Sequence, residues 1–155
     1  MLTAERINDA VEEYGDMLYR LCIVMLQSTA DAEDAVQETF ITYMEKSPPF
    51  GDSEHEKAWL LKVARNKCRN VLRYRKRHFS EPAEVLDTLV ERTPDSRILE
   101  SLMELPETYR SILHLHYITG YKVDEIAEIT GLRSSAVKMR LHKGRKLLAE
   151  EYGKE

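Results

Sequence analysis

Apolar residues recur at helical spacing in most of the chain, and no alternating pattern that would indicate a strand competes with them. In the first half this pattern predicts three helices. One runs through residues 14–26, one follows candidate caps at Ser28, Thr29 and Asp31, and one runs from about residue 57 to 77. The first half is therefore expected to form a small helical bundle.

Two segments interrupt the helical pattern. The stretch SPPFGDSEHE, residues 47–56, contains two prolines and a glycine and predicts a loop before the third helix. Residues 79–96 lose the apolar periodicity, are acidic and contain Pro82 and Pro94. We interpret this second segment as a linker with room for one short helical turn.

Beyond the linker the helical pattern resumes. It predicts a short helix, a break at Pro106, where a proline fits the first turn of a helix, and a further helix to about Tyr117. We therefore expect an all-α fold made of two small helical domains, residues 1–78 and 97–155, joined by the linker.

The last third of the chain has the spacing of a helix-turn-helix motif. Ala127, Gly131 and Val137 fall where such a motif needs a small residue, a turn glycine and a buried residue. Gly131 suits the turn because glycine adopts positive φ at little cost, and Ser134 or Ser135 is expected to cap the second helix. The inward side of that helix is predicted to hold Val137, Leu141, Gly144 and Leu148, and the outward side Ser135, Met139, His142 and Lys146, flanked by Lys138 and Lys143.

Charge is segregated along the chain. The formal net charge is -4, yet residues 62–78 carry eight Lys or Arg and no acid, and residues 133–146 carry six and no acid. Solvated helix faces usually mix signs to gain i,i+4 ion pairs, so two acid-free strips favour two contacts with a polyanion. The second strip lies on the second helix of the motif. A helix of this kind fits the major groove of B-DNA, with early residues at base edges and basic ones at phosphates.

Composition and spacing argue against several other classes. A hydrophobic content of 43% and a charged content of 32% are typical of a soluble globular protein, and the apolar run LCIVML is too short to span a membrane. No signal peptide is recognisable and Cys22 and Cys68 are too few for a disulfide framework, so we expect a reduced, cytoplasmic protein. Cys68 falls on the inward side of its helix, which predicts a buried structural thiol. His114 and His116 are two residues apart, the wrong spacing for one helical face, and no Gly-rich phosphate loop occurs, so we expect no metal, cofactor or catalysis.

The motifs resemble those of a known family. The stretch LPETYRSILHLHYITGYKVDEIAEITGLRSSAVKMRLHKGRKLL resembles region 4, the C-terminal promoter-binding region of bacterial sigma factors. DAEDAVQETFITYM and AWLLKVARNKCRNVLRYRKR are similar to region 2 of the same proteins. This order, with only a short linker between, resembles the extracytoplasmic-function (ECF) group, the smallest members of the sigma-70 family. The resemblance covers about residues 5–152 and implies a protein that binds core RNA polymerase and directs promoter-specific initiation of transcription.

The resemblance implies a role for each helix. The second helix of region 2 docks on core polymerase in this family, and the matching face here consists of Asp34, Gln37, Glu38 and Ile41, separate from a predicted core stripe that includes Phe40 and Met44. The third helix resembles the part that opens and reads the minus-10 element, and its candidate DNA-binding residues are Arg65, Asn66, Lys67, Arg69, Asn70, Arg73 and Tyr74. The second helix of the helix-turn-helix resembles the part that reads the minus-35 element, and its candidates are Arg133, Ser134, Ser135, Lys138, Met139, Arg140, His142, Lys143 and Lys146.

Two features of region 2 keep more than one interpretation. The loop Phe50–Lys57 corresponds to the family segment that captures a flipped base, but GDSEHEK is acidic. It therefore either contacts a base or shapes specificity by repulsion. Trp59 either stacks on an unstacked base or closes the core of the bundle, the interpretation that we favour.

The resemblance also implies the partners. These are core RNA polymerase, promoter DNA and an anti-sigma factor, often membrane-anchored, with no small-molecule substrate and a monomeric free state. The alternative is a helix-turn-helix repressor or activator that acts without being a polymerase subunit. Such a regulator would explain the second basic strip but neither the first strip nor the acidic docking face, and it would usually form a symmetric dimer on a palindromic site.

Overall fold

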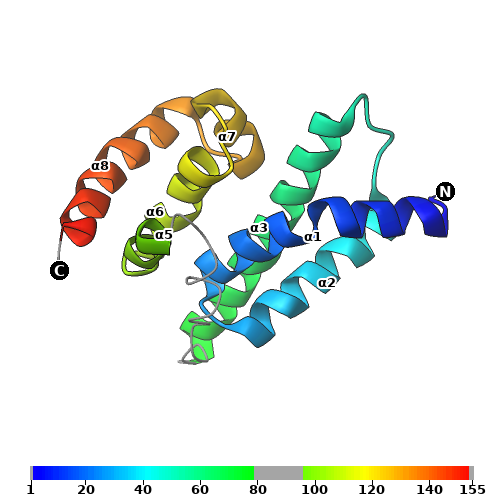
Figure 1. The fold of residues 1–155 in the computed structure, drawn as a ribbon, viewed down its shortest axis with the longest axis horizontal. Coiled ribbons are helices and arrows are strands. Elements are labelled where there is room, and N and C mark those ends of the chain that lie inside the picture. The colour runs from blue at the N-terminus through cyan, green and yellow to red at the C-terminus, as the bar shows by residue number, and fades with distance from the viewer. Residues whose placement is uncertain (1, 79–95, 154–155) are drawn as a thin grey trace. The chain divides into compact units, whose positions relative to one another are not determined.

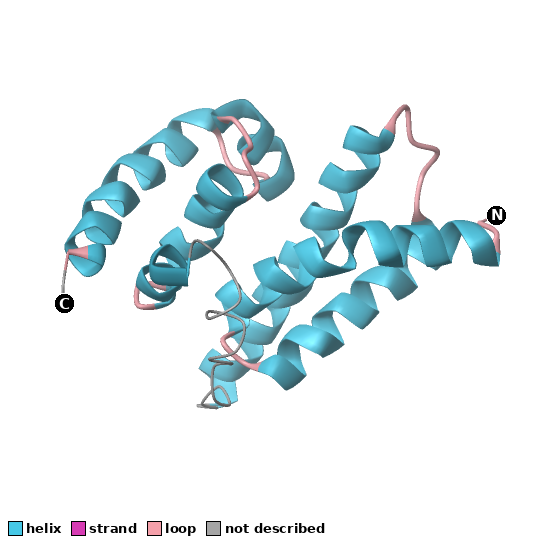
Figure 2. Ribbon diagram, in the orientation of Figure 1, coloured by secondary structure: helices cyan, strands magenta, loops and turns pink. Residues whose placement is uncertain are grey.

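The computed structural model describes residues 2–78 and 96–153, and every regular element in these ranges is a helix (Figure 2). The predicted all-α fold is confirmed. The chain divides into two compact units, Met1–Ala83 and Glu84–Glu155, called here unit 1 and unit 2. The segment interpreted as the linker lies outside the described residues, apart from Ser96, where a helix begins.

Unit 1 consists of three mutually packed helices, α1 (Ala4–Leu26), α2 (Thr29–Lys46) and α3 (Ser53–His78) (Figure 1). The turn between α1 and α2 is short because both helix ends are capped within it. Gln27 takes a left-handed conformation with φ of 53° and donates its N–H to the carbonyl of Ile23. Ser28 Oγ accepts the N–H of Asp31 at 3.2 Å, so Ser28 is the cap among the three candidates.

The interior of unit 1 is apolar and closely packed. Its fully buried large side chains are Leu18, Leu21, Ile23, Leu26, Tyr43, Leu60 and Leu61, and burial of one such side chain contributes roughly 1.5–3 kcal/mol. Cys22 and Cys68 are both buried free thiols, as expected for Cys68. A hydrogen bond with the Cys68 thiol, together with burial, raises the pKa of Cys22, so the Cys22 thiol is held in the unreactive protonated form.

The third helix begins earlier than its apolar pattern predicts. The expected start was near residue 57, but α3 begins at Ser53, and Asp52 Oδ1 accepts the N–H of His55 at 2.8 Å. Glu54 and Glu56 lie in the first turn, where acidic side chains interact favourably with the helix dipole. Most of the acidic stretch predicted as a loop is therefore the start of a helix, and the loop between α2 and α3 comprises only residues 47–52.

Unit 2 contains α5 (Ser96–Met103), α6 (Glu107–Leu113), the π-helical segment η1 (His114–Ile118), α7 (Val123–Thr130) and α8 (Ser134–Tyr152). Pro106 is the residue that precedes α6 rather than a residue of its first turn. The helix predicted to run to about Tyr117 does so, but its last five residues, from His114, have the wider π-helical winding. The buried side chains at the centre of unit 2 include Leu102, Ile112, Leu113, Leu115 and Ile126.

The helix-turn-helix is formed by α7 and α8. Gly131 has φ of 75° and donates its N–H to the carbonyl of Ala127 at 2.9 Å, which confirms its predicted role as the turn residue. α8 packs against α6 through Gly144, where an added Cβ would lie 3.0 Å from Cδ1 of Leu113. The glycine therefore allows the close approach that holds α8 on the body of unit 2.

Candidate nucleic-acid interface

One side of α8 is buried and the opposite side is exposed. Val137, Leu141 and Gly144 are buried and Leu148 is half-buried, as predicted for the inward side. The predicted outward residues Ser135, Lys138, Met139, His142, Lys143 and Lys146 are all exposed, and so is Arg145. Met139 is 69% exposed, an unusual position for a large apolar side chain. As far as Lys146 this helix thus presents a basic face without any acid, together with one apolar side chain for a partner; the exposed Glu150 follows one turn later.

The start of α8 differs in detail from expectation. Neither serine caps the helix, because Arg133 occupies the cap position and is exposed. Ser134 instead donates its hydroxyl to Asp124 Oδ1 at 2.8 Å and so ties α8 to the first turn of α7. Ser134 and Arg140 are half-buried, which leaves them less available to a partner than the exposed set.

The basic strip of α3 is only partly exposed. Asn66, Arg69, Asn70, Arg73 and Tyr74 are exposed, at spacings that place them on one side of the helix. The side chains of Asn and Arg there form a polar and basic surface next to an aromatic ring. This arrangement suits a single nucleic-acid strand, whose phosphates bind cations and whose bases stack and form hydrogen bonds.

Two further members of the strip are in different surroundings. Arg65 is only 6% exposed, because it lies one turn from the buried residues Leu61 and Cys68. The prediction that Arg65 belongs to the exposed DNA-binding face is therefore not supported by its position. Lys67 is half-buried, and its Nζ lies 4.0 Å from a carboxylate oxygen of Glu38 on α2.

Arg75 has a structural role that the sequence pattern does not reveal. Its guanidinium donates to the carbonyl of Leu26 at 2.8 Å and to Asp31 Oδ2 at 2.6 Å. It thereby closes the C-terminal end of α1 and pairs with the first turn of α2. Arg75 therefore stabilises unit 1, although it belongs to the same acid-free strip as the exposed cations.

The predicted polymerase-binding face of α2 is exposed. Asp34, Gln37, Glu38 and Ile41 are all exposed, with Ile41 at 41%. Met44 was expected in the core stripe with Phe40, but it is 47% exposed while Phe40 is buried. Met44 lies three residues beyond Ile41, and it therefore extends the exposed face with a second apolar side chain.

A buried carboxylate connects the three helices of unit 1. Glu56 is 3% exposed and forms an ion pair with Arg6. Its oxygens accept the hydroxyls of Tyr14 at 3.2 Å and Tyr43 at 2.5 Å. Burial alone would raise the pKa of Glu56, but these hydrogen bonds and the charge of Arg6 outweigh it and lower that pKa. Burial and the neighbouring carboxylate raise the pKa of Tyr14 and of Tyr43 to about 12, so both hydroxyls remain protonated donors at neutral pH.

Aromatic rings surround the loop between α2 and α3. The ring of Phe50 is stacked with that of Tyr43, with centroids 6.4 Å apart, and lies edge-on to Trp59 at 5.7 Å and His55 at 5.2 Å. Trp59 is half-buried and packs against Tyr43 as well. Its contacts are those expected of a residue that closes the core of unit 1.

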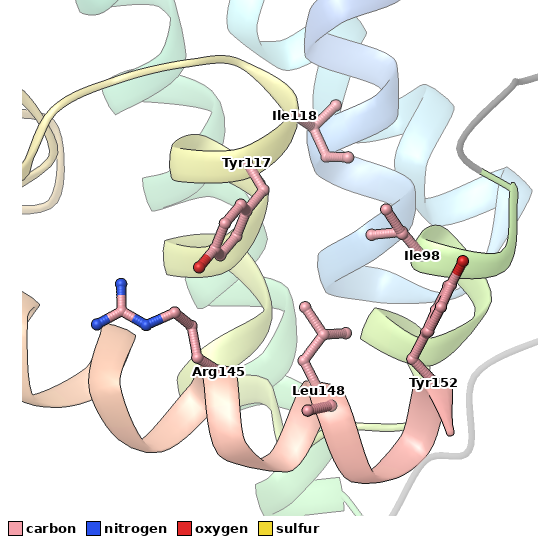
Figure 3. Close-up of a pocket in the computed structure, with 7 residues that line it drawn as sticks. Ile98, Tyr117, Ile118, Arg145, Leu148 and Tyr152 are labelled. Carbon is pink, nitrogen blue, oxygen red and sulfur yellow. The ribbon is translucent and has the colours of Figure 1, made fainter. Parts of the chain in front are cut away.

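An apolar groove of about 500 Å³ lies within unit 2 (Figure 3). Ile98, Tyr117 and Ile118 line it opposite Leu148 and Tyr152 of α8, and the side chain of Arg145 extends beside Tyr117 (Figure 3). At one end, the guanidinium of Arg97 lies 4.3 Å from the centre of the Tyr152 ring and donates to the Tyr152 carbonyl at 2.9 Å. The groove is an exposed apolar surface of the kind that protein partners cover.

The histidines of unit 2 have separate surroundings. His114 is buried, whereas His116 is half-buried with its Nδ1 2.9 Å from the carbonyl oxygen of Tyr121. Within residues 2–78 and 96–153, no group of three or more potential metal ligands comes together. In the same ranges no helix is both long and apolar enough to cross a lipid bilayer.

The fold and the exposed basic faces define an all-helical protein with a helix-turn-helix suited to DNA. Two family models match the chain, sigma-70 region 2 over residues 10–78 and sigma-70 region 4 over residues 95–148. The chain therefore belongs to the sigma-70 family of RNA polymerase sigma factors. The predicted resemblance is confirmed, and the alternative of a regulator that is not a polymerase subunit is not favoured.

Relatives of known identity place the chain in the ECF group. It is 29% identical to the ECF RNA polymerase sigma factor SigW of Bacillus subtilis, over 92% of this chain and 87% of that protein. It is also 29% identical to SigV of Bacillus subtilis, over 94% and 90% of the two chains, and to the ECF sigma factor SigL of Mycobacterium tuberculosis, over 84% and 80%.

Solved structures share the fold. The sigma factor RpoE in complex with the anti-sigma factor NepR, from Bartonella quintana, matches with a TM-score of 0.72 at 22% identity, over 93% of this chain and 94% of that one. CnrH in complex with the cytosolic domain of CnrY matches with a TM-score of 0.67 at 23% identity, over 96% and 88%. At this level of identity the likeness supports the fold rather than particular contacts.

Proposed function

We propose that this sigma factor directs core RNA polymerase to promoters by reading the minus-35 element with α8 and the minus-10 element with α3. The observation that carries the proposal is the exposed face of α8 from Ser135 to Lys146, which is basic and free of acids and is held on a helix-turn-helix. The corresponding domains are residues 1–78 for region 2 and residues 97–155 for region 4, with 79–96 between them. The protein acts in the cytoplasm, where it forms part of the initiation complex and leaves the chemistry to the polymerase.

In the minus-35 contact, α8 enters the major groove. Its early residues are Ser135, Lys138 and Met139, and these face base edges. Met139, at 69% exposure, suits the methyl group of a thymine. The later residues His142, Lys143 and Lys146, with Arg133 at the helix start, bind the phosphates on either side. Ser134 and Arg140, both half-buried, orient the helix and contribute less direct contact.

In the minus-10 contact, the exposed side of α3 binds the displaced strand. Asn66 and Asn70 carry amides that form hydrogen bonds with unstacked base edges, while Arg69 and Arg73 neutralise phosphates and Tyr74 offers a ring for stacking. We leave Arg65 out of the direct contacts, because its side chain is buried in unit 1.

The exposed face of α2 is the proposed contact with core polymerase. Its two apolar side chains, Ile41 and Met44, lie among the acidic and amide groups of Asp34, Gln37 and Glu38. Such a mixed surface can bury apolar area and match a basic partner. Asp34→Arg should lower the affinity for core polymerase while leaving the circular dichroism spectrum and unfolding midpoint unchanged, because Asp34 is exposed. An unchanged polymerase affinity would remove Asp34 from this face.

An anti-sigma factor is the proposed regulator of the free protein. Two solved structures that share the fold are complexes, RpoE with the anti-sigma factor NepR and CnrH with the cytosolic domain of CnrY. We extend this type of partner, membrane-anchored in some cases, to the present chain. Without partners the chain is expected to be a monomer that takes no small-molecule substrate.

Reconstituted transcription tests the proposal. Purified protein and core RNA polymerase are incubated with a genomic fragment library, and the transcripts are sequenced. We expect start sites that share two sequence elements at a fixed spacing, and none with core polymerase alone. A protein that binds a palindromic site as a dimer, and yields no specific transcripts with core polymerase, would instead be a conventional helix-turn-helix regulator.

A further inference from the structure

Glu56 gathers polar partners from both other helices of unit 1. Arg6 and Tyr14 belong to α1 and Tyr43 belongs to α2, while Glu56 itself lies in the first turn of α3. The polar hub, defined as Arg6, Tyr14, Tyr43 and Glu56, is therefore a single point at which all three helices are joined.

Stability alone gives a weak reason for such a hub. A buried carboxylate loses its hydration, and an ion pair with hydrogen bonds restores only part of that loss. Apolar residues of similar size often stabilise a protein as well or better. What the hub adds is direction, because hydrogen bonds to Glu56 fix the orientation of Tyr14 and Tyr43 in a way that apolar packing does not.

Both tyrosines pass that fixed orientation to the loop at residues 47–52. The ring of Tyr43 is stacked with Phe50, at an interplanar angle of 8°. The hydroxyl of Tyr14 lies 3.3 Å from the carbonyl oxygen of Ser53, where the loop joins α3. Phe50 in the loop and Ser53 at the C-terminal end of the loop therefore each contact a tyrosine that is hydrogen-bonded to Glu56.

The hub also forms one wall of an open cavity beside the loop. Arg6, Phe50, Asp52, Ser53 and Glu56 line this cavity, which has a volume of about 280 Å³. A change in the position of Phe50 or Ser53 would change its shape directly. Two hub residues, Arg6 and Glu56, thus share one surface with the loop.

We propose that Glu56 is a positioning residue for promoter recognition, which fixes the loop at residues 47–52 through Tyr43 and Tyr14 and thereby sets the base preference at the minus-10 element. The proposal rests on the proposed function, since it requires this loop to face minus-10 DNA. Glu56 acts through the loop and does not itself touch the DNA.

The test compares promoter choice by holoenzymes reconstituted with core RNA polymerase. One promoter library is randomised at the minus-10 element with a constant minus-35 element, and a second library is randomised at the minus-35 element. The variants are Glu56→Gln, which keeps the shape and removes the charge, and Tyr43→Phe and Tyr14→Phe, which each remove one hydroxyl. Glu5→Gln is the matched control, because Glu5 precedes Arg6 on α1 but is exposed.

We expect Glu56→Gln to relax the preference at one or two minus-10 positions by about fivefold or more, the lower end of what one base pair contributes to specificity. Tyr43→Phe should relax the same positions to a smaller extent. Preferences at the minus-35 element should not change in any variant, and Glu5→Gln should match the wild type in both libraries.

A spectroscopic readout accompanies the transcription data. Trp59 is the only tryptophan of the chain and contacts both Tyr43 and Phe50. Its emission in the free, folded protein should therefore change in Glu56→Gln and Tyr43→Phe but not in Glu5→Gln. The tyrosine variants carry the test if Glu56→Gln does not fold.

Three results separate the outcomes. A uniform loss of transcription with unchanged minus-10 preferences in every hub variant would show that Glu56 only stabilises unit 1, and would overturn the inference. Altered minus-35 preferences would equally count against it, because the hub lies within unit 1 whereas the proposed minus-35 contact is made by α8 of unit 2. If the wild-type holoenzyme shows no preference in either library, the proposed function itself fails.

Discussion

The two basic helices look alike in sequence but are built differently. Both α3 and α8 carry an acid-free run of cations, yet α8 buries only apolar residues and glycine, at Val137, Leu141 and Gly144. In α3, by contrast, Arg65 is buried and Arg75 is paired with Asp31. A run of basic residues in the sequence therefore does not by itself define a nucleic-acid surface. The cations that are buried or paired within the fold do not belong to that surface.

This difference follows from the surroundings of each helix. α3 packs against two long helices, and some of its cations lie on the side that faces them. A cation in such a position needs a partner, because it has lost part of its hydration. α8 lies on the smaller body of unit 2, and Gly144 lets it approach Leu113 without a long side chain between them. Fewer of the basic residues of α8 than of α3 are therefore used to stabilise the fold.

The first prediction contrasts two arginines of α3. Arg75→Ala should lower the free energy of unfolding of unit 1 by about 1.5–3 kcal/mol, because it removes hydrogen bonds from a charged group to Asp31 and Leu26. Arg73→Ala, which is exposed, should change it by less than about 0.5 kcal/mol. Denaturant unfolding followed by the emission of Trp59 measures unit 1 specifically, since the chain has no other tryptophan.

In promoter opening, Arg73→Ala should have the larger effect of the two variants and Arg75→Ala the smaller. Once folded at low denaturant, Arg75→Ala should retain promoter opening, while Arg73→Ala should lose part of it. Equal loss of stability in the two variants would mean that the contacts of Arg75 do not distinguish it from its exposed neighbour.

A second prediction concerns the exposed face of α8. Because Lys143 is proposed to bind a phosphate, Lys143→Ala should weaken use of promoters that depend on the minus-35 element uniformly across their sequences. A loss of roughly 1–3 kcal/mol confined to one base pair would show that this lysine reads a base instead. The free energy of unfolding of the variant should equal that of the wild type, because the Lys143 side chain is exposed. In-vitro transcription from promoters with and without a minus-35 element measures the effect. Lys122→Ala, an exposed lysine outside α8, is the control and should have no minus-35 phenotype.

Sequence patterns predicted α8 better than α3 for a physical reason. The exposed face of α8 and the turn at Gly131 depend on residues within a few positions of one another, so helical periodicity and glycine conformation are enough to find them. The pairs Arg75–Asp31 and Arg6–Glu56 join residues 44 and 50 positions apart. No local spacing encodes such pairs, and acidic residues at positions 54 and 56 were therefore assigned to a loop that the structure makes helical.

The buried carboxylate predicts a pH dependence of unit 1. The pKa of Glu56 is lower in the folded protein than its ordinary value of 4.5, so the ionised form binds its partners more strongly than the protonated form. This contribution to stability is complete above pH 4.5 and is lost as the pH falls through the lowered pKa. Glu56→Gln lacks the ionisable carboxyl group, so its stability should not show this pH dependence.

Unfolding monitored by Trp59 at a series of pH values checks this expectation. The difference in free energy of unfolding between wild type and Glu56→Gln should be constant near neutral pH and shrink as the solution is acidified below pH 4.5. A difference that stays constant throughout, or grows on acidification, would contradict the sign of the shift.

The smallest expected effect lies where the two proposed contacts of unit 1 meet. Lys67 belongs to the proposed DNA strip of α3 and Glu38 to the proposed polymerase face of α2, and their charged atoms are 4.0 Å apart. Their side chains are 32% and 60% exposed, so the pair should contribute less than about 1 kcal/mol to stability. Lys67→Ala should accordingly leave unfolding nearly unchanged.

Such a weak pair leaves Lys67 available to DNA. If it binds a phosphate, Lys67→Ala should reduce the slope of log affinity against log salt for holoenzyme on promoter DNA by about 1. Glu38→Gln should leave that slope unchanged and lower the affinity for core polymerase instead. A salt slope that does not respond to Lys67→Ala would remove this lysine from the DNA contacts of α3 and leave Arg69 and Arg73 as the exposed arginines that bind phosphates there.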